Sequence, residues 1–197
     1  ELAERQARSA ALSGDKYDAL MAEGARYASK EDTRRAARTY REAIALKPDE
    51  PTACYNLGAA LANSGHEVEA AQRFLEARER WPVGSEDWAC ATAEAFHKLR
   101  TYECAEVAKP EWWNDEALEA LSLRVLRAAP NEASAIGMRA QVLSGASGAW
   151  EVRPRSAAEF KEAAALFDRS AALCHAPALK AKLSWVADHC RSRAETA

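Results

Sequence analysis

Two pairs of adjacent residues near the carboxyl end, Cys174-His175 and His189-Cys190, have side chains of the kinds that bind zinc. Pro177 predicts the start of a helix between the pairs, because proline is favoured at the first helical position. His189 would then lie about 12 residues along that helix, roughly 18 Å away at 1.5 Å per residue. Side chains that far apart cannot share one ion whose ligand bonds are about 2.0–2.3 Å long. We therefore expect no metal site.

The cysteines also argue against a disulfide framework and against thiol catalysis. Their number is odd, they lack CxxC spacing, and no family signature of a thiol enzyme accompanies them. No glycine-rich loop that would cradle a phosphate is present. We expect a protein without catalytic residues or cofactors, in a reducing, intracellular compartment. The cysteines are Cys54, Cys90, Cys104, Cys174 and Cys190.

The charge balance and the apolar runs exclude two further classes. Lys and Arg total 27 against 30 Asp and Glu, a net charge of −3, whereas nucleic-acid-binding proteins usually carry a basic excess that neutralises phosphate. No apolar run approaches the ~18 residues that span a bilayer, and the polar residues 1–11 do not read as a secretory signal. We expect no nucleic-acid partner, no membrane insertion and a cytoplasmic location.

The densest positive charge lies in residues 30–47, where acidic residues are interleaved. Glu31 and Arg35, and likewise Arg38 and Glu42, stand four residues apart, which is the spacing of ion pairs on a helix. This pattern favours a solvated helix face over a site for an acidic partner.

Residues of similar type recur at an interval of 34 residues, which indicates repeated structural units that would position any site. Within one such unit, residues 54–61 place an apolar stripe on one helical face, and residues 63–66 then form a turn. A second helix carries Ala70 and Phe74 on one face. Gly58 and Ala70 are small enough for two antiparallel helices to approach closely. Residues related by the interval are Pro48 and Pro82; Leu20, Cys54 and Trp88; Gly24, Gly58 and Thr92; Tyr40 and Phe74; and Ala43 and Ala77.

These units resemble the tetratricopeptide repeat, whose pattern is W-x2-L-G-x2-Y, then A-x3-F, then P. The resemblance implies an all-α fold in which antiparallel helix pairs stack into a right-handed superhelix, with about four units and a C-terminal capping helix. The matching residues are Leu20, Glu23, Gly24, Tyr27, Ala36, Tyr40 and Pro48 in the first unit, Cys54, Leu57, Gly58, Leu61, Ala70, Phe74 and Pro82 in the second, and, more loosely, Trp88, Ala91, Thr92 and Ala95 in the third.

The expected organisation is a single domain over residues 1–197. Asn114 is predicted to be the N-cap of a helix through Ala129. The capping helix is predicted to bury Leu179, Leu183 and Val186. The segments are a flanking helix at 1–16, repeats at 17–50, 51–84, 85–132 (with an insertion near 100–113) and 133–176 (with an insertion near 145–155), and the capping helix at 177–197.

The resemblance implies that the first helix of each pair forms an inner wall that holds a peptide or helix of a partner protein. Its small side chains would admit a backbone, Tyr55 could stack, and Asn56 could pair with peptide groups. Glu86 stands where the chaperone-tail-binding members have a cation, which disfavours that subfamily. The predicted wall consists of Met21, Ala25, Thr52, Tyr55, Asn56, Ala59, Asn63, Glu86, Ala89, Ala93 and His97.

Two alternatives stay open for Trp112 and Trp113 in the first insertion: they cover core exposed by the irregular third unit, or they contact a partner. The function expected is that of a protein-interaction scaffold. The lack of an initiator Met motivates the alternative of a targeting or regulatory module of a larger enzyme or complex. Helical-repeat binding of RNA is opposed by Glu86 and by the net charge of −3.

Overall fold

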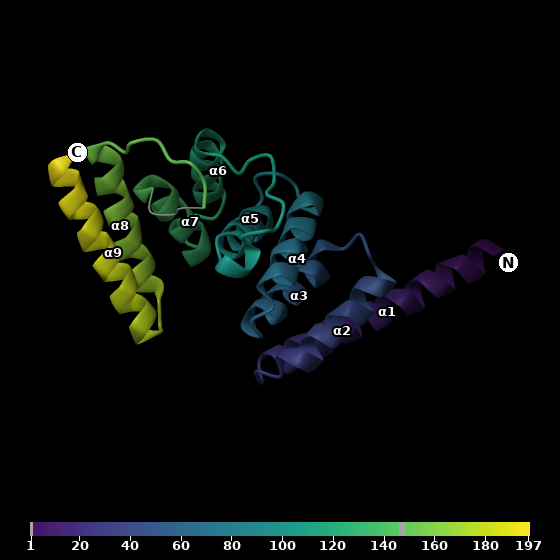
Figure 1. The fold of residues 1–197 in the computed structure, drawn as a ribbon. Coiled ribbons are helices and arrows are strands. Elements are labelled where there is room, and N and C mark those ends of the chain that lie inside the picture. Colours follow the sequence, from purple (N-terminus) through teal and green to yellow (C-terminus); the bar gives the residue numbers. More distant parts are fainter. Residues whose placement is uncertain (1, 146–148) are drawn as a thin grey trace. The chain divides into compact units, whose positions relative to one another are not determined.

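The computed structural model describes residues 2–145 and 149–197, with side chains from residue 15 onward (Figure 1). Within these ranges the secondary structure is helical, with no β-strand, which confirms the predicted all-α class. Contacts between residues divide the chain into two compact units, of which the second begins at Pro82. The division falls close to the predicted junction between the second and third repeats.

In its described residues, 2–81, the first unit contains four helices that pack against one another in chain order. The helix α1 is continuous across residue 16, so the structure has no break where the flanking helix was expected to meet the first repeat. A single interior glycine, Gly14, costs a helix only about 1 kcal/mol and does not end it. The helices are α1 (Leu2–Ala28), α2 (Thr33–Leu46), α3 (Pro51–Asn63) and α4 (Glu67–Arg80).

Local chemistry fixes the ends of these helices. The Asp32 carboxylate caps α2 by accepting a hydrogen bond from the Arg35 amide at 3.1 Å. Pro51 occupies the first turn of α3. The predicted turn at 63–66 is confirmed, and Gly65 adopts there a φ of 77°, which glycine accommodates without steric cost.

The core of the first unit is built from small-to-aromatic contacts between paired helices. Gly58 on α3 faces the ring of Phe74 on α4, and Gly24 on α1 faces the ring of Tyr40 on α2. Both rings are buried. The 34-residue interval of the sequence is therefore an interval of packing.

The second unit contains five α-helices and one short 3₁₀ helix in its described residues. Asn114 caps α6 by accepting from the Ala117 amide at 3.0 Å, and Pro177 begins α9, both as predicted. Packing joins α5 to α6 and α7, and then continues from α6 through α9 in order. The elements are α5 (Glu86–Leu99), η1 (Tyr102–Cys104), α6 (Asp115–Ala128), α7 (Ala133–Ser144), α8 (Ala157–Leu173) and α9 (Pro177–Thr196).

The buried face of α9 differs in part from the prediction. Leu183 and Val186 pack partly buried against the core, but Leu179 is 49% exposed, so its expected burial is wrong. The stripe toward α8 continues instead through Ala187 and Cys190, one and two turns beyond Leu183. Leu179 lies in the first turn of α9 and lines an open cavity.

Candidate functional site

A cavity of about 600 Å³ opens in the first unit between the α1–α2 turn and α3. Asn56, Ala59 and Asn63 of the predicted wall line it. This cavity is called the first-unit cavity below. Its other described lining residues are Ala28, Glu31, Thr33, Tyr40 and Ala60.

The lining of the first-unit cavity suits a peptide backbone. Asn56 and Asn63 are seven residues apart on α3, so their amides lie on one face, two turns from each other. Each amide can both donate and accept a hydrogen bond. Ala59 and Ala60 between them are small, which leaves room for a chain to approach.

The α1–α2 turn forms the other side of this cavity. Glu31 has a φ of 59°, which is uncommon for a residue with a side chain, and its carbonyl accepts from the Thr33 amide at 2.9 Å. The Glu31 carboxylate is exposed, and it places a negative charge at a lining position.

Four other predicted wall residues of the first unit do not line this cavity. Tyr55 is half-buried, with its ring edge-on to Phe74 at 5.3 Å and to Trp81 at 5.6 Å between centroids. Met21 packs against the core around Tyr17. The remaining two, Ala25 and Thr52, are exposed.

For the second unit the predicted wall needs correction. Ala89 and Ala93 are fully buried, because α5 packs against both α6 and α7, so neither can meet a ligand. His97 is half-buried, with Nε2 2.9 Å from the Ser134 carbonyl, and burial lowers its pKa below the usual range. Glu86 is exposed.

The two insertion tryptophans contact residues of their own unit. The Trp113 ring lies 5.6 Å from Phe96 and 5.8 Å from Trp150, and its Nε1 donates to the Ala149 carbonyl at 2.9 Å. Trp112 is half-buried and lies 5.6 Å from Trp113. These contacts favour the hypothesis that the tryptophans cover the core of the third repeat.

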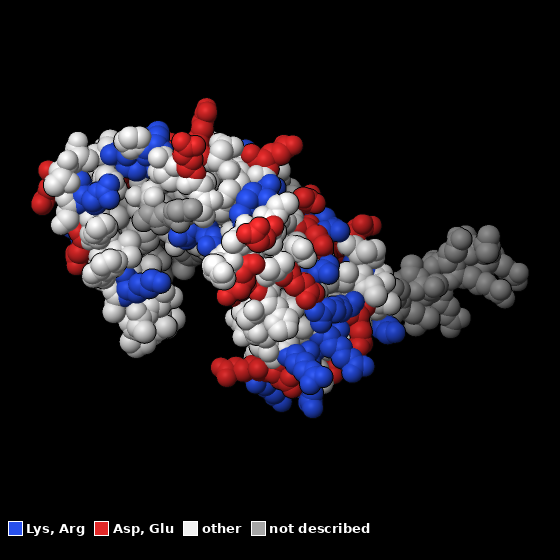
Figure 2. Space-filling model, in the orientation of Figure 1, with Lys and Arg blue, Asp and Glu red and all other residues white. Residues whose placement is uncertain are grey.

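Figure 2 shows Lys and Arg side chains gathered over α2, with acidic side chains among them. Arg38 pairs with Glu42 at 3.2 Å, as the spacing predicts, and Arg41 pairs with Glu69 of α4 at 2.9 Å. Such exposed pairs contribute at most about 1 kcal/mol each.

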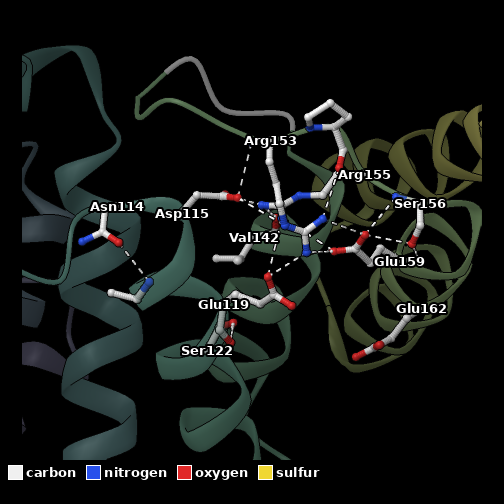
Figure 3. Close-up of polar contacts among 12 residues, drawn as sticks. Asn114, Asp115, Glu119, Ser122, Val142, Arg153, Arg155, Ser156, Glu159 and Glu162 are labelled. Atoms are coloured by element: carbon white, nitrogen blue, oxygen red, sulfur yellow. Dashed lines mark hydrogen bonds and ion pairs between the residues drawn. The ribbon is translucent and has the colours of Figure 1, made fainter.

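A cluster of ion pairs, which the sequence did not reveal, joins the second insertion to its neighbours (Figure 3). The Arg155 side chain is 2% exposed; it contacts Asp115 of α6 and donates to the Val142 carbonyl at 3.0 Å. Arg153 donates to Glu119 of α6 at 2.8 Å and to Glu159 of α8 at 2.6 Å.

Glu159 also completes the capping box of α8 with Ser156. Burial acts to raise the pKa of Glu159, but the hydrogen bonds from Arg153 and from the Ser156 amide and hydroxyl outweigh it and lower this pKa to about 2. Glu159 therefore stays ionised throughout the neutral range.

The described residues also bear on two other classes of site. Those residues include no group of three or more His, Cys, Asp or Glu side chains placed to hold a metal ion. Among the described helices, none combines the length and the apolar character needed to cross a membrane.

Paired antiparallel helices with repeated glycine–aromatic contacts define an all-α helical-repeat protein. The family model of the TPR repeat matches residues 24–65. This match and the paired helices agree with the predicted resemblance to the tetratricopeptide repeat. No curated protein matches the sequence significantly.

MamA and YrrB are two of the solved structures that share the fold. The MamA protein superimposes with a TM-score of 0.57 at 14% sequence identity, over 93% of this chain and 88% of that chain. YrrB, described as a TPR protein with an unusual peptide-binding site, gives a TM-score of 0.52 at 15% identity, over 88% of this chain and 85% of that chain.

Proposed function

We propose that this protein is an interaction scaffold that binds a peptide or helical segment of another protein in the first-unit cavity. The observation that carries the proposal is the pair of amides of Asn56 and Asn63, set two turns apart across a lining of alanine. An extended peptide offers N–H and C=O groups that such amides pair with. The peptide-binding site described for YrrB, a protein of the same fold, supports it.

The proposal is tested by selecting peptides from a displayed random library on the full chain and measuring their affinities. Replacing both Asn56 and Asn63 by Ala removes the pairing amides but leaves the buried stripe of α3 intact. We expect a loss of about five- to thirtyfold in affinity, since one or two hydrogen bonds of about 1 kcal/mol each are removed.

The matched control is Gln72→Ala, which removes an exposed amide from α4 outside the cavity lining. We expect this variant to bind the selected peptides as the parent protein does. Peptides that bind the parent and the Asn56→Ala, Asn63→Ala variant equally well would show that the first-unit cavity is not the binding site.

A further inference from the structure

Two cavities adjoin each other in the second unit, and neither was foreseen from the sequence. One, of about 290 Å³, is lined by Lys182 and Arg100 and is called the Lys182 cavity. The other, of about 320 Å³, is lined by Arg193 and by the end of the second insertion and is called the Arg193 cavity. Ser144 and Val186 line both, so together they form one hollow along α7 and α9.

The floor of this hollow is apolar. Phe167 and Leu183 line the Lys182 cavity, and Phe160 lines the Arg193 cavity. Leu179, also a lining residue, is 49% exposed. Exposed apolar area of this kind gains free energy when a ligand side chain covers it.

The charges around the hollow are all positive. None of the described lining residues of either cavity is an Asp or Glu, although the whole chain carries a net charge of −3. Arg153 and Arg155, at one end, are already paired with carboxylates of α6 and α8 that do not line the hollow. Lys182 and Arg193 form no ion pair with any residue the structure describes.

Two further observations indicate that the hollow is suited to a polar, negatively charged ligand. Arg100 lines the Lys182 cavity, and burial lowers its pKa while the side chain stays a cation. The Gln141 Oε1 atom is buried without a hydrogen-bond partner among the described residues. An amide oxygen of this kind can accept a hydrogen bond from a peptide N–H.

We propose that the second unit carries its own binding site, in this hollow, for an acidic segment of another protein that also has leucine-like side chains. The site goes beyond the function proposed for the first unit. The positive rim complements acidic side chains, and the exposed Leu179 with the partly buried Leu183 and Val186 complements apolar ones. Each cavity has room for a few side chains.

The test uses two fluorescein-labelled eight-residue peptides of alternating Glu and Leu or alternating Gln and Leu, with fluorescence anisotropy measured on the full chain. We expect the Glu peptide to bind at least about tenfold more tightly than the Gln peptide at low salt, and this preference to shrink as salt screens the charges. Equal affinities for the two peptides would overturn the proposal.

Lys182→Glu reverses a charge at the rim on an exposed residue. We expect it to weaken binding of the Glu peptide by about three- to tenfold. Lys180→Glu makes the same change two residues away, on α9 but outside the lining, and should alter affinity by less than about twofold. Equal effects of the two variants would mean that only general charge attraction is involved, and would overturn the site.

A third measurement excludes the competing class of ligand. A single-stranded RNA oligonucleotide is added as a competitor at the same charge concentration. We expect it to displace the Glu peptide poorly, because the apolar floor offers nothing to a phosphate backbone. If RNA bound more tightly than the peptide, and if Lys182→Glu abolished that binding of RNA, the hollow would be assigned to nucleic acid instead.

The Asn56→Ala, Asn63→Ala variant separates this site from the first-unit cavity. We expect that variant to bind the Glu peptide with the affinity of the parent protein.

Discussion

Gly58 faces the ring of Phe74 so closely that a β-carbon at position 58 would come within 3.0 Å of that ring. One repeat earlier, a β-carbon at Gly24 would come within 2.5 Å of Tyr40. The two rings are buried, so they have little room to move aside. These contacts set the approach of α1 to α2 and of α3 to α4.

The first prediction concerns these glycines. Alanine is favoured over glycine in a helix by about 1 kcal/mol. At position 24 the clash with Tyr40 should outweigh that gain, so we expect Gly24→Ala to destabilise the fold by about 1–3 kcal/mol. Gly58→Leu should cost at least as much. Urea denaturation followed by circular dichroism measures both.

Gly137 on α7 provides the control for that prediction. A β-carbon there would lie 3.5 Å from the His97 ring, which is an ordinary van der Waals distance. We therefore expect Gly137→Ala to be neutral or to stabilise by up to about 1 kcal/mol. If Gly24→Ala stabilised the protein as much as Gly137→Ala, the close contact with Tyr40 would be refuted.

The second prediction concerns Tyr55. Its ring packs edge-on against Phe74 and Trp81, so it supports the fold of the first unit. We expect Tyr55→Ala to lower the free energy of unfolding by about 2 kcal/mol, through lost apolar burial and aromatic contact. Thr52→Ala, at an exposed position of the same helix, should change it by less than about 0.5 kcal/mol. Thermal melts that cannot tell the two variants apart would refute this assignment.

The third prediction separates two tryptophans of the second unit. Trp113 contacts Phe96 and Trp150 and donates to a backbone carbonyl, so Trp113→Ala should cost about 3 kcal/mol of stability. Trp185 is 68% exposed, and we expect Trp185→Ala to cost less than about 1 kcal/mol. Chemical denaturation of both variants makes the comparison. If Trp113→Ala kept the full stability of the parent, the alternative that the insertion contacts a partner protein would be favoured instead.

The fourth prediction concerns acid stability. The pKa of Glu159 in the folded protein, about 2, lies below the value of about 4.3 for an unfolded chain. The ionised carboxylate therefore contributes stability above the unfolded pKa, and this contribution is lost as pH falls toward 2. Glu159→Gln should lower stability at pH 7 and make the decline between pH 5 and about pH 2 shallower than in the parent. Glu151→Gln, at an exposed position of the second insertion, should leave the decline unchanged.

Much of the fold could be predicted because it depends on local chemistry. Asn114 caps α6 and Pro177 begins α9 through preferences of single residues for helix ends. The glycine–aromatic contacts recur at 34 residues because each of these repeats packs its two helices together through the same kind of contact.

The rest depends on contacts that no local pattern encodes. Tyr55 meets Trp81 only because the end of α4 returns beside α3. Ala89 and Ala93 are buried because α5, in the irregular third repeat, has two helical neighbours. Arg155 contacts Asp115, which lies 40 residues earlier in the sequence. Arg155 belongs to the second insertion, whose course through the fold is not predicted by the repeat pattern.

The reach of Arg155 has a consequence for how the second unit unfolds. In a plain repeat array each repeat touches only its neighbours, so the terminal repeat can open while the next stays closed. Here one buried guanidinium holds a side chain of α6, a carbonyl of α7 and, at 3.6 Å, a side chain of α8. If α8 opened alone, the Arg155 guanidinium would lose part of its compensation by carboxylates, which is costly for a buried charge. We therefore expect the amides of the last two repeats to lose their protection against hydrogen exchange together, as one cooperative unit.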